Sequence, residues 1–123
     1  MTDAEMQFFM GSAGALPLYA ELRRRVLELW PETEIRVAKT QISFRERYGW
    51  AFVSTRRMKR GCAGPFINLS LGLGRRLDTP RVFAASEPYP GRWTNHICIC
   101  SAEEIDGELM ALLAGARQFA LTK

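Results

Sequence analysis

Basic side chains offer the clearest binding chemistry in this sequence. Lys39, Arg45 and His96 lie in or beside segments that we interpret as strands. If those strands are neighbours, these side chains line a cleft that holds a carboxylate or a phosphate. We therefore predict a candidate pocket around Lys39, Arg45 and His96. The alternative is that Lys39 protects an edge strand from aggregation, which is a common use of lysine.

Two arginine-rich connections between strands form a second candidate site. Clustered cations bind the phosphates of a nucleic acid or of a phosphorylated ligand, and Tyr48, Trp50 and Trp93 would add stacking surface. The predicted anion-binding residues are Arg56, Arg57, Lys59, Arg60, Arg75 and Arg76. The alternative is a solvated basic face, because no helix-turn-helix, zinc-finger or RNA-recognition motif accompanies these residues.

His96, Cys98 and Cys100 alternate along a predicted strand, so their side chains share one face. Zinc ligands converge on one point at about 2.0–2.3 Å, whereas alternate strand residues lie roughly 6.6–7 Å apart. We therefore predict no metal site and no cofactor, and we interpret these residues as packing residues. A thiol nucleophile needs an imidazole beside it, which one regular strand does not provide, so no catalytic residue is predicted.

The composition is that of one globular domain. A chain of 123 residues with 47% hydrophobic and 24% charged residues forms a single core, so we predict one domain over residues 1–123. The chain contains no apolar run of about 18 residues, and it begins with an acidic segment rather than a secretory signal. Its three cysteines are an odd number, which is typical of reduced thiols. We expect a cytoplasmic protein with no membrane partner.

Positive charge is concentrated in the middle of the chain. The net charge is only +4, but basic residues gather between positions 36 and 81, where Glu46 and Asp78 are the only acidic residues. Such an excess attracts an anionic partner. It equally attracts acidic helices of the same fold.

Three segments have the pattern of helices. Thr2 with Glu5 and Ser101 with Glu104 each match a capping box, which predicts a helix from each of these points. Pro17 suits the first turn of another helix, in which hydrophobic residues recur every four positions. The sequence therefore predicts two helices before the strands and one after them.

Between these helices the hydrophobic period changes to two, which is typical of strands. The predicted strands cover residues 35–37, 42–44, 50–53, 66–73, 81–86 and 94–100. The strand at 66–73 alternates longest and is predicted to be central, whereas residues 88–91 have the composition of a loop. We predict an α+β fold, with an antiparallel sheet of four to six strands and the two N-terminal helices and one C-terminal helix packed mainly on one face.

Several short segments match the pattern of a known family. They are residues 39–44, the aromatic strand at 50–52, the leucine-alternating strand at 69–73, and the strand with His96 that leads into 101–109. Over about residues 18–116 the chain resembles domain-of-unknown-function family 5655, a small domain labelled as associated with predicted transport. The resemblance implies no catalytic residues. Arg117 departs from the family pattern, which favours an aromatic residue late in the last helix.

These observations support three classes of function. The first is a non-enzymatic binding module with a basic, aromatic-bearing surface for an anionic partner, either a nucleic acid or a phosphate-bearing ligand. The second is a small ligand-binding protein or enzyme that uses the candidate pocket. The third is a homodimerisation or interaction domain, because the core of so short a chain leaves aromatic surface uncovered, from Trp30, Trp50, Trp93, Phe8 and Phe9. We favour the first class.

Overall fold

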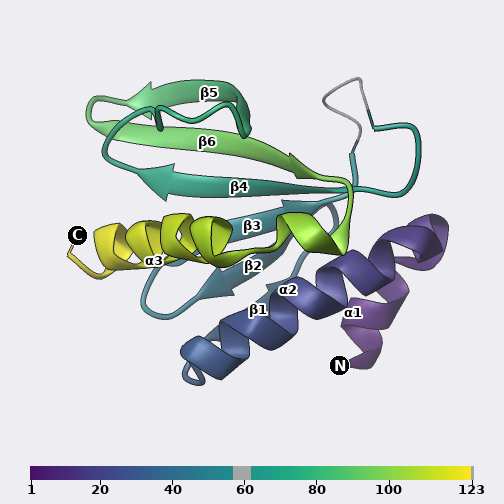
Figure 1. Ribbon diagram of the computed structural model, residues 1–123. Helices are drawn as coiled ribbons and strands as arrows, with labels where there is room; N and C mark the ends of the chain where they lie inside the picture. Colours follow the sequence, from purple (N-terminus) through teal and green to yellow (C-terminus); the bar gives the residue numbers. More distant parts are fainter. Residues whose placement is uncertain (57–61, 123) are drawn as a thin grey trace.

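The fold is a layer of helices on a single antiparallel sheet (Figure 1). The structure is a computed structural model that describes residues 1–56 and 62–122. Among these residues the sheet has six strands in the order β1-β2-β3-β4-β6-β5. The strands are β1 Glu34–Val37, β2 Ile42–Arg45, β3 Gly49–Ser54, β4 Ile67–Leu73, β5 Val82–Tyr89 and β6 Arg92–Ile99. The predicted central strand is confirmed, because β4 lies between β3 and β6.

Among the described residues, two α-helices precede the sheet and one follows it, so the predicted α+β fold is confirmed. The helical elements are α1 Asp3–Phe8, the 3₁₀ turn η1 Met10–Ala15, α2 Leu16–Leu29, the 3₁₀ turn η2 Ala102–Glu104 and α3 Gly107–Leu121. Figure 1 shows α2 and α3 in front of the same face of the sheet. We call this the helix face, and the opposite side of the sheet the open face.

The first helix begins where the sequence predicts. The Thr2 hydroxyl accepts a hydrogen bond from the Glu5 amide at 3.2 Å, and the Glu5 carboxylate accepts one from the Thr2 amide at 2.9 Å. These two bonds form a capping box, which satisfies donors that a helix start leaves free. Pro17 lies in the first turn of α2, as predicted.

The last helix begins later than predicted. Ser101 was the expected N-cap, but it precedes only the short turn η2, and its side chain makes no capping hydrogen bond among the described residues. Asp106 caps α3 instead, because its carboxylate accepts from the Leu109 amide at 3.0 Å. The Ser101–Glu104 pattern therefore precedes one 3₁₀ turn without forming a capping box, and the Asp106 cap starts the helix.

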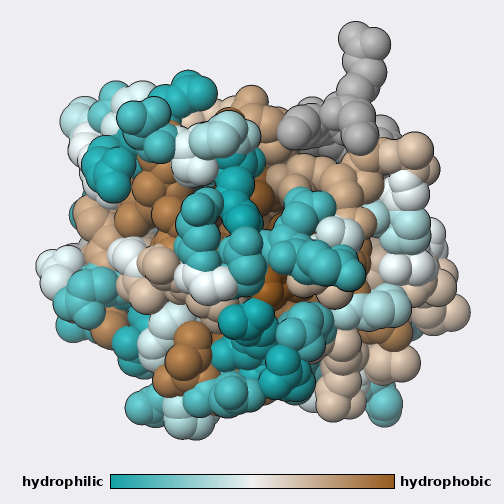
Figure 2. Space-filling view, viewed as in Figure 1, coloured by the Kyte–Doolittle hydropathy of each residue, from teal (hydrophilic) through white to brown (hydrophobic). Residues whose placement is uncertain are grey.

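Alternation along β4 separates the two faces of the sheet. Ile67, Leu69 and Leu71 are fully buried in the core beneath the helices. Ser70 and Gly72 are half-buried on the open face. On the side that carries α2 and α3, hydrophilic residues cover the middle of the surface, and hydrophobic residues show in smaller groups around them (Figure 2).

The edge strand β5 extends into a segment that we predict as a loop. It continues through Pro88 to Tyr89, because proline is tolerated on an edge strand, where its missing N–H removes no ladder hydrogen bond. Only Pro90 and Gly91 then separate Tyr89 from its partner Arg92. Gly91 has a φ of 73°, which suits glycine after a proline in a tight turn.

Aromatic side chains fill the core more completely than predicted. Trp50 and Phe9 are each 1% exposed, and Trp30 packs edge-on against Trp50 with ring centroids 5.5 Å apart. Trp50 reaches the helix face because the pairing of β2 with β3 shifts by one residue there, which is typical of a β-bulge. Of the five aromatic residues behind the homodimer hypothesis, Trp50 and Phe9 are buried, whereas Phe8, Trp30 and Trp93 are half-buried. The homodimer stays a prediction.

Arg117, late in the last helix, packs against an aromatic ring. Its guanidinium lies 5.6 Å from the centroid of the Trp30 ring, and it pairs with the Glu46 carboxylate at 2.6 Å. The pair joins α3 to the β2–β3 turn.

Candidate functional site

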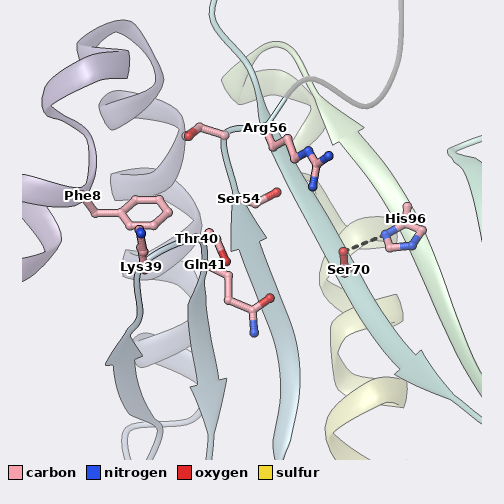
Figure 3. A pocket seen from close by; sticks show the side chains of 9 residues that line it. Phe8, Lys39, Thr40, Gln41, Ser54, Arg56, Ser70 and His96 are labelled. Carbon is pink, nitrogen blue, oxygen red and sulfur yellow. Dashed lines mark hydrogen bonds between the residues drawn. The ribbon is translucent and has the colours of Figure 1, made fainter. Parts of the chain in front are cut away.

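A pocket of about 470 Å³ opens on the open face of the sheet (Figure 3). It is lined by Phe8, Lys39, Thr40, Gln41, Ser54, Thr55, Arg56, Ser70 and His96. These residues come from the end of α1, the β1–β2 turn, the end of β3, and the middles of β4 and β6. Segments that are distant in the sequence therefore meet at one place.

Two of the three predicted pocket residues lie in this pocket. Lys39 lies in the β1–β2 turn, which is closed by a hydrogen bond of 2.9 Å from the Ala38 amide to the Gln41 carbonyl. His96 lies in β6 and lines the same pocket. The structure therefore brings Lys39 and His96 to one pocket, and their predicted part in binding a carboxylate or phosphate stays a prediction.

Arg45 does not belong to the pocket, which corrects the predicted set. It is the last residue of β2, whereas Lys39 precedes the first. Four strand residues span roughly 10 Å, so the two cations lie toward opposite ends of the strand. Its Nε atom is buried and has no hydrogen-bond partner among the described residues.

Ser70 and His96 form the closest polar contact in the pocket. They are directly opposite in the pairing of β4 with β6, and Ser70 Oγ lies 2.8 Å from His96 Nδ1. Burial lowers the pKa of His96 below its ordinary value, because the charged ring is less well solvated there. Burial therefore favours the neutral form of the ring.

Arg56 reaches the pocket from the chain that leaves β3. The buried Asn68 on β4 donates hydrogen bonds from its side-chain amide to the Arg56 carbonyl and, at 3.4 Å, to Ser54 Oγ. Asn68 thereby fixes the backbone at the rim of the pocket.

The cations of the pocket differ from the five described arginines that form ion pairs, namely Arg23, Arg24, Arg36, Arg81 and Arg117. Neither Lys39 nor Arg56 forms an ion pair with any residue that the structure describes. By contrast, Arg81 pairs with Asp106 at 2.6 Å and Arg117 with Glu46 at 2.6 Å. No carboxylate lines the pocket within the described part of the chain.

The six predicted anion-binding residues do not form one described cluster. Arg56 follows β3, next to the start of β4, whereas Arg75 and Arg76 follow the end of β4. The seven residues of β4 separate the two groups by roughly 20 Å. Asn95 holds the second group in place, because its side chain donates to the Arg75 carbonyl at 3.1 Å.

Arg57, Lys59 and Arg60 lie outside the described residues. Their predicted part in anion binding stays a prediction.

The three cysteines lie together, although Cys62 is distant from the others in sequence. Cys98 Sγ lies 3.8 Å from Cys100 Sγ, and the Cys62 thiol hydrogen-bonds to that of Cys100. Burial, and then the bonds to Cys62 and Cys98, raise the pKa of Cys100 to about 12. Across residues 1–56 and 62–122, no group of three or more histidine, cysteine, aspartate or glutamate side chains is arranged to hold a metal ion.

Sequence reasoning missed five polar residues that line the pocket, namely Thr40, Gln41, Ser54, Thr55 and Ser70, and it missed Asn68, which bonds to the pocket rim. Two of them carry a weak signal, because Asn68 and Ser70 are the polar members of an alternating strand. Asn68 contacts Ser54 because β4 pairs with β3, and Ser70 contacts His96 because β4 pairs with β6. These partners lie 14 and 26 positions apart in the sequence.

In the part of the chain that the structure describes, no helix has the length and apolar character needed to cross a membrane. The predicted cytoplasmic location stays a prediction.

The comparisons with known proteins identify the family and no relative of known activity. No curated protein and no solved structure matches the chain. The profile of a family described as a domain of unknown function, DUF5655, matches residues 5–120. That match covers nearly the whole chain, including every residue of the pocket. The chain therefore belongs to the DUF5655 family.

Proposed function

We propose that the pocket on the open face binds a small organic anion through a phosphate or carboxylate group. One observation carries this proposal: two cations without ion-pair partners, Lys39 and Arg56, line a pocket in which no described residue is acidic. Hydrogen bonds between a charged donor and an oxyanion are among the strongest polar contacts that proteins make.

The size and the other lining groups of the pocket support a small ligand. A volume of about 470 Å³ is in the range of pockets that hold metabolite-sized molecules. Hydroxyl groups of Thr40, Ser54, Thr55 and Ser70 supply uncharged donors and acceptors. Phe8 gives one wall an aromatic surface.

This proposal develops the second class of function predicted from the sequence. The nucleic-acid partner of the first class stays a prediction. It gains less support, because the arginine groups at 56 and 75–76 lie at opposite ends of β4. An oligonucleotide is therefore included as a comparison ligand in the test.

Calorimetric titration with inorganic phosphate, sulfate and succinate tests the proposal. We expect Lys39→Gln and Arg56→Gln each to weaken binding about 10-fold or more, because each removes a charge-assisted hydrogen bond worth about 1.5–3 kcal/mol. Binding is expected to weaken with added salt, as charge attraction is screened.

The double substitution Arg75→Gln with Arg76→Gln is the matched control. It removes charge at the far end of β4, so anion affinity is expected to stay within about 2-fold of the wild-type value. An equal loss of anion affinity in all variants would show a general effect of net charge and contradict the proposal. A single-stranded oligonucleotide that binds more tightly than the small anions, with dependence on Arg75 and Arg76, would favour the nucleic-acid partner instead.

A further inference from the structure

Ser70 and His96 have the geometry of a nucleophile with its general base. Ser70 Oγ and His96 Nδ1 are 2.8 Å apart, which is the distance at which a hydroxyl donates to an imidazole nitrogen. Figure 3 shows both side chains inside the pocket, joined by this contact. The neutral state of the ring supports the same arrangement, since a protonated ring has no lone pair to accept from serine.

We propose that Ser70, with His96 as its general base, attacks the carbonyl carbon of an ester whose anionic end is held by Lys39 and Arg56. This inference rests on the proposed anion-binding function and adds a substrate class and an activity to it. The substrate is an ester that also carries a carboxylate or phosphate group.

The pairing of the strands sets an upper limit on the distance between the anionic group and the reacting carbonyl group of such a substrate. Ser70 lies two residues along β4 from Asn68, which holds the Arg56 backbone, and Lys39 lies near the neighbouring end of β2. Adjacent strands are about 4.8 Å apart, so the anionic group and the reacting carbonyl are separated by roughly 10–14 Å at most. Short-chain diacid monoesters are within this span.

The reaction uses only the ester and water. The Oγ–carbon bond forms while the Ser70 proton passes to His96 Nδ1, and the carbonyl oxygen becomes an oxyanion. The carbon–oxygen bond to the alcohol then breaks, and the alcohol takes the proton from His96. Water attacks the acyl-serine, gives a proton to His96, and Ser70 leaves with that proton. The products are the acid and the alcohol.

The charge of the pocket favours this step. The charged side chains among its described lining residues are both cations, so the negative charge that develops on the carbonyl oxygen lies in a positive field. The same field favours a negatively charged ester over a neutral one.

The test compares mono-p-nitrophenyl succinate with p-nitrophenyl acetate as acyl donors. We expect a succinyl group on Ser70, located by peptide mapping of the wild-type chain. We also expect a larger protein-dependent increase in p-nitrophenol release for the succinate ester, where each rate is divided by the rate of the same ester without protein, because the free carboxylate of this ester also attacks its own carbonyl group. Ser70→Ala is expected to abolish the modification of residue 70 and the protein-dependent increase. His96→Gln, which keeps a hydrogen-bonding side chain but no base, is expected to lower the rate about 100-fold or more.

Ser86→Ala is the control, because Ser86 is an exposed serine of β5 that does not line the pocket. Its acylation rate is expected to stay near the wild-type value. Acylation of a lysine, or of Ser54 in place of Ser70, would overturn the proposal. Binding of succinate without acylation of Ser70 would also overturn it and leave the anion-binding function standing, whereas absence of succinate binding would end both.

Discussion

His96 gives the pocket a charge that depends on pH. Among the described lining residues, His96 is the side chain whose type changes charge between pH 5 and 8. Burial lowers its pKa below the ordinary value of 6.5. When the pH falls below the lowered pKa of His96, the imidazole therefore gains a positive charge beside the bound anion.

We accordingly predict that affinity for sulfate rises as pH falls from 8 to 5. Sulfate keeps its double negative charge across this range, so the change reports on the protein. The measurement is a series of calorimetric titrations at constant ionic strength. His96→Gln is expected to give a flatter profile, and an affinity of the wild-type protein that is constant or falls toward pH 5 would contradict the prediction.

Helix α1 illustrates stabilisation at the scale of an element. Six residues are too few for an isolated helix to be stable in water. Glu5 is 1% exposed and joins α1 to α2, because its carboxylate accepts hydrogen bonds from the Tyr19 hydroxyl and, at 2.7 Å, from Arg23 Nε. Phe8, at the end of this helix, is thereby held at the wall of the pocket.

Glu5→Gln is expected to destabilise the protein at pH 7 and much less at pH 2–3. Burial raises the pKa of Glu5, but bonds from Arg23, the Thr2 backbone and Tyr19 outweigh it and lower the pKa to about 2. Because the pKa of Glu5 is lower in the folded state, its ionised carboxylate stabilises the folded protein at pH values above the ordinary pKa of 4.5. This contribution is lost as the pH falls toward 2. This lowering of the pKa corresponds to about 3 kcal/mol in the free energy of unfolding.

Urea unfolding of wild type and Glu5→Gln at several pH values measures this difference. Glu21→Gln is the control, since Glu21 pairs with Arg24 on the exposed side of α2 and should matter little. A stability difference between wild type and Glu5→Gln that does not shrink between pH 5 and 2 would show that the carboxylate charge is not its cause.

At the scale of the molecule, the two faces of the sheet have separate roles. The helix face carries the hydrophobic core, in which α3 packs on β3 and β4. The open face carries the pocket. Stability and binding are therefore expected to respond to different substitutions.

Leu113→Ala tests this separation, because Leu113 on α3 is fully buried against the helix face. We expect a loss of about 2–5 kcal/mol in the free energy of unfolding, from lost burial and the cavity left behind. Sulfate affinity of the folded variant should remain near the wild-type value. Leu112→Ala, at a half-buried position, is expected to cost less.

The measurements are denaturant midpoints and sulfate titrations on the same preparations. An equal loss of stability in the two variants, or loss of sulfate binding by folded Leu113→Ala, would contradict the division between faces.

Local patterns along the sequence account for most elements. Alternation predicted β4 and its central place, and the Thr2–Glu5 capping box predicted the start of α1. The errors arose where a local pattern had two structural outcomes. The capping-box pattern at Ser101 formed no capping box and preceded only a 3₁₀ turn, and Pro88 lay in an edge strand instead of a loop.

The sequence by itself determined the α+β class, the approximate position of each element and the residues available for binding. Hydrophobic periodicity and helix capping depend on residues that are close together in the sequence. The helices and strands can therefore be predicted from the sequence alone. Only the tertiary structure decided that Ser70 meets His96, that Lys39 and Arg56 share a pocket, and that Arg45 does not. Strand order and register decide such contacts, and both depend on packing between residues far apart in sequence.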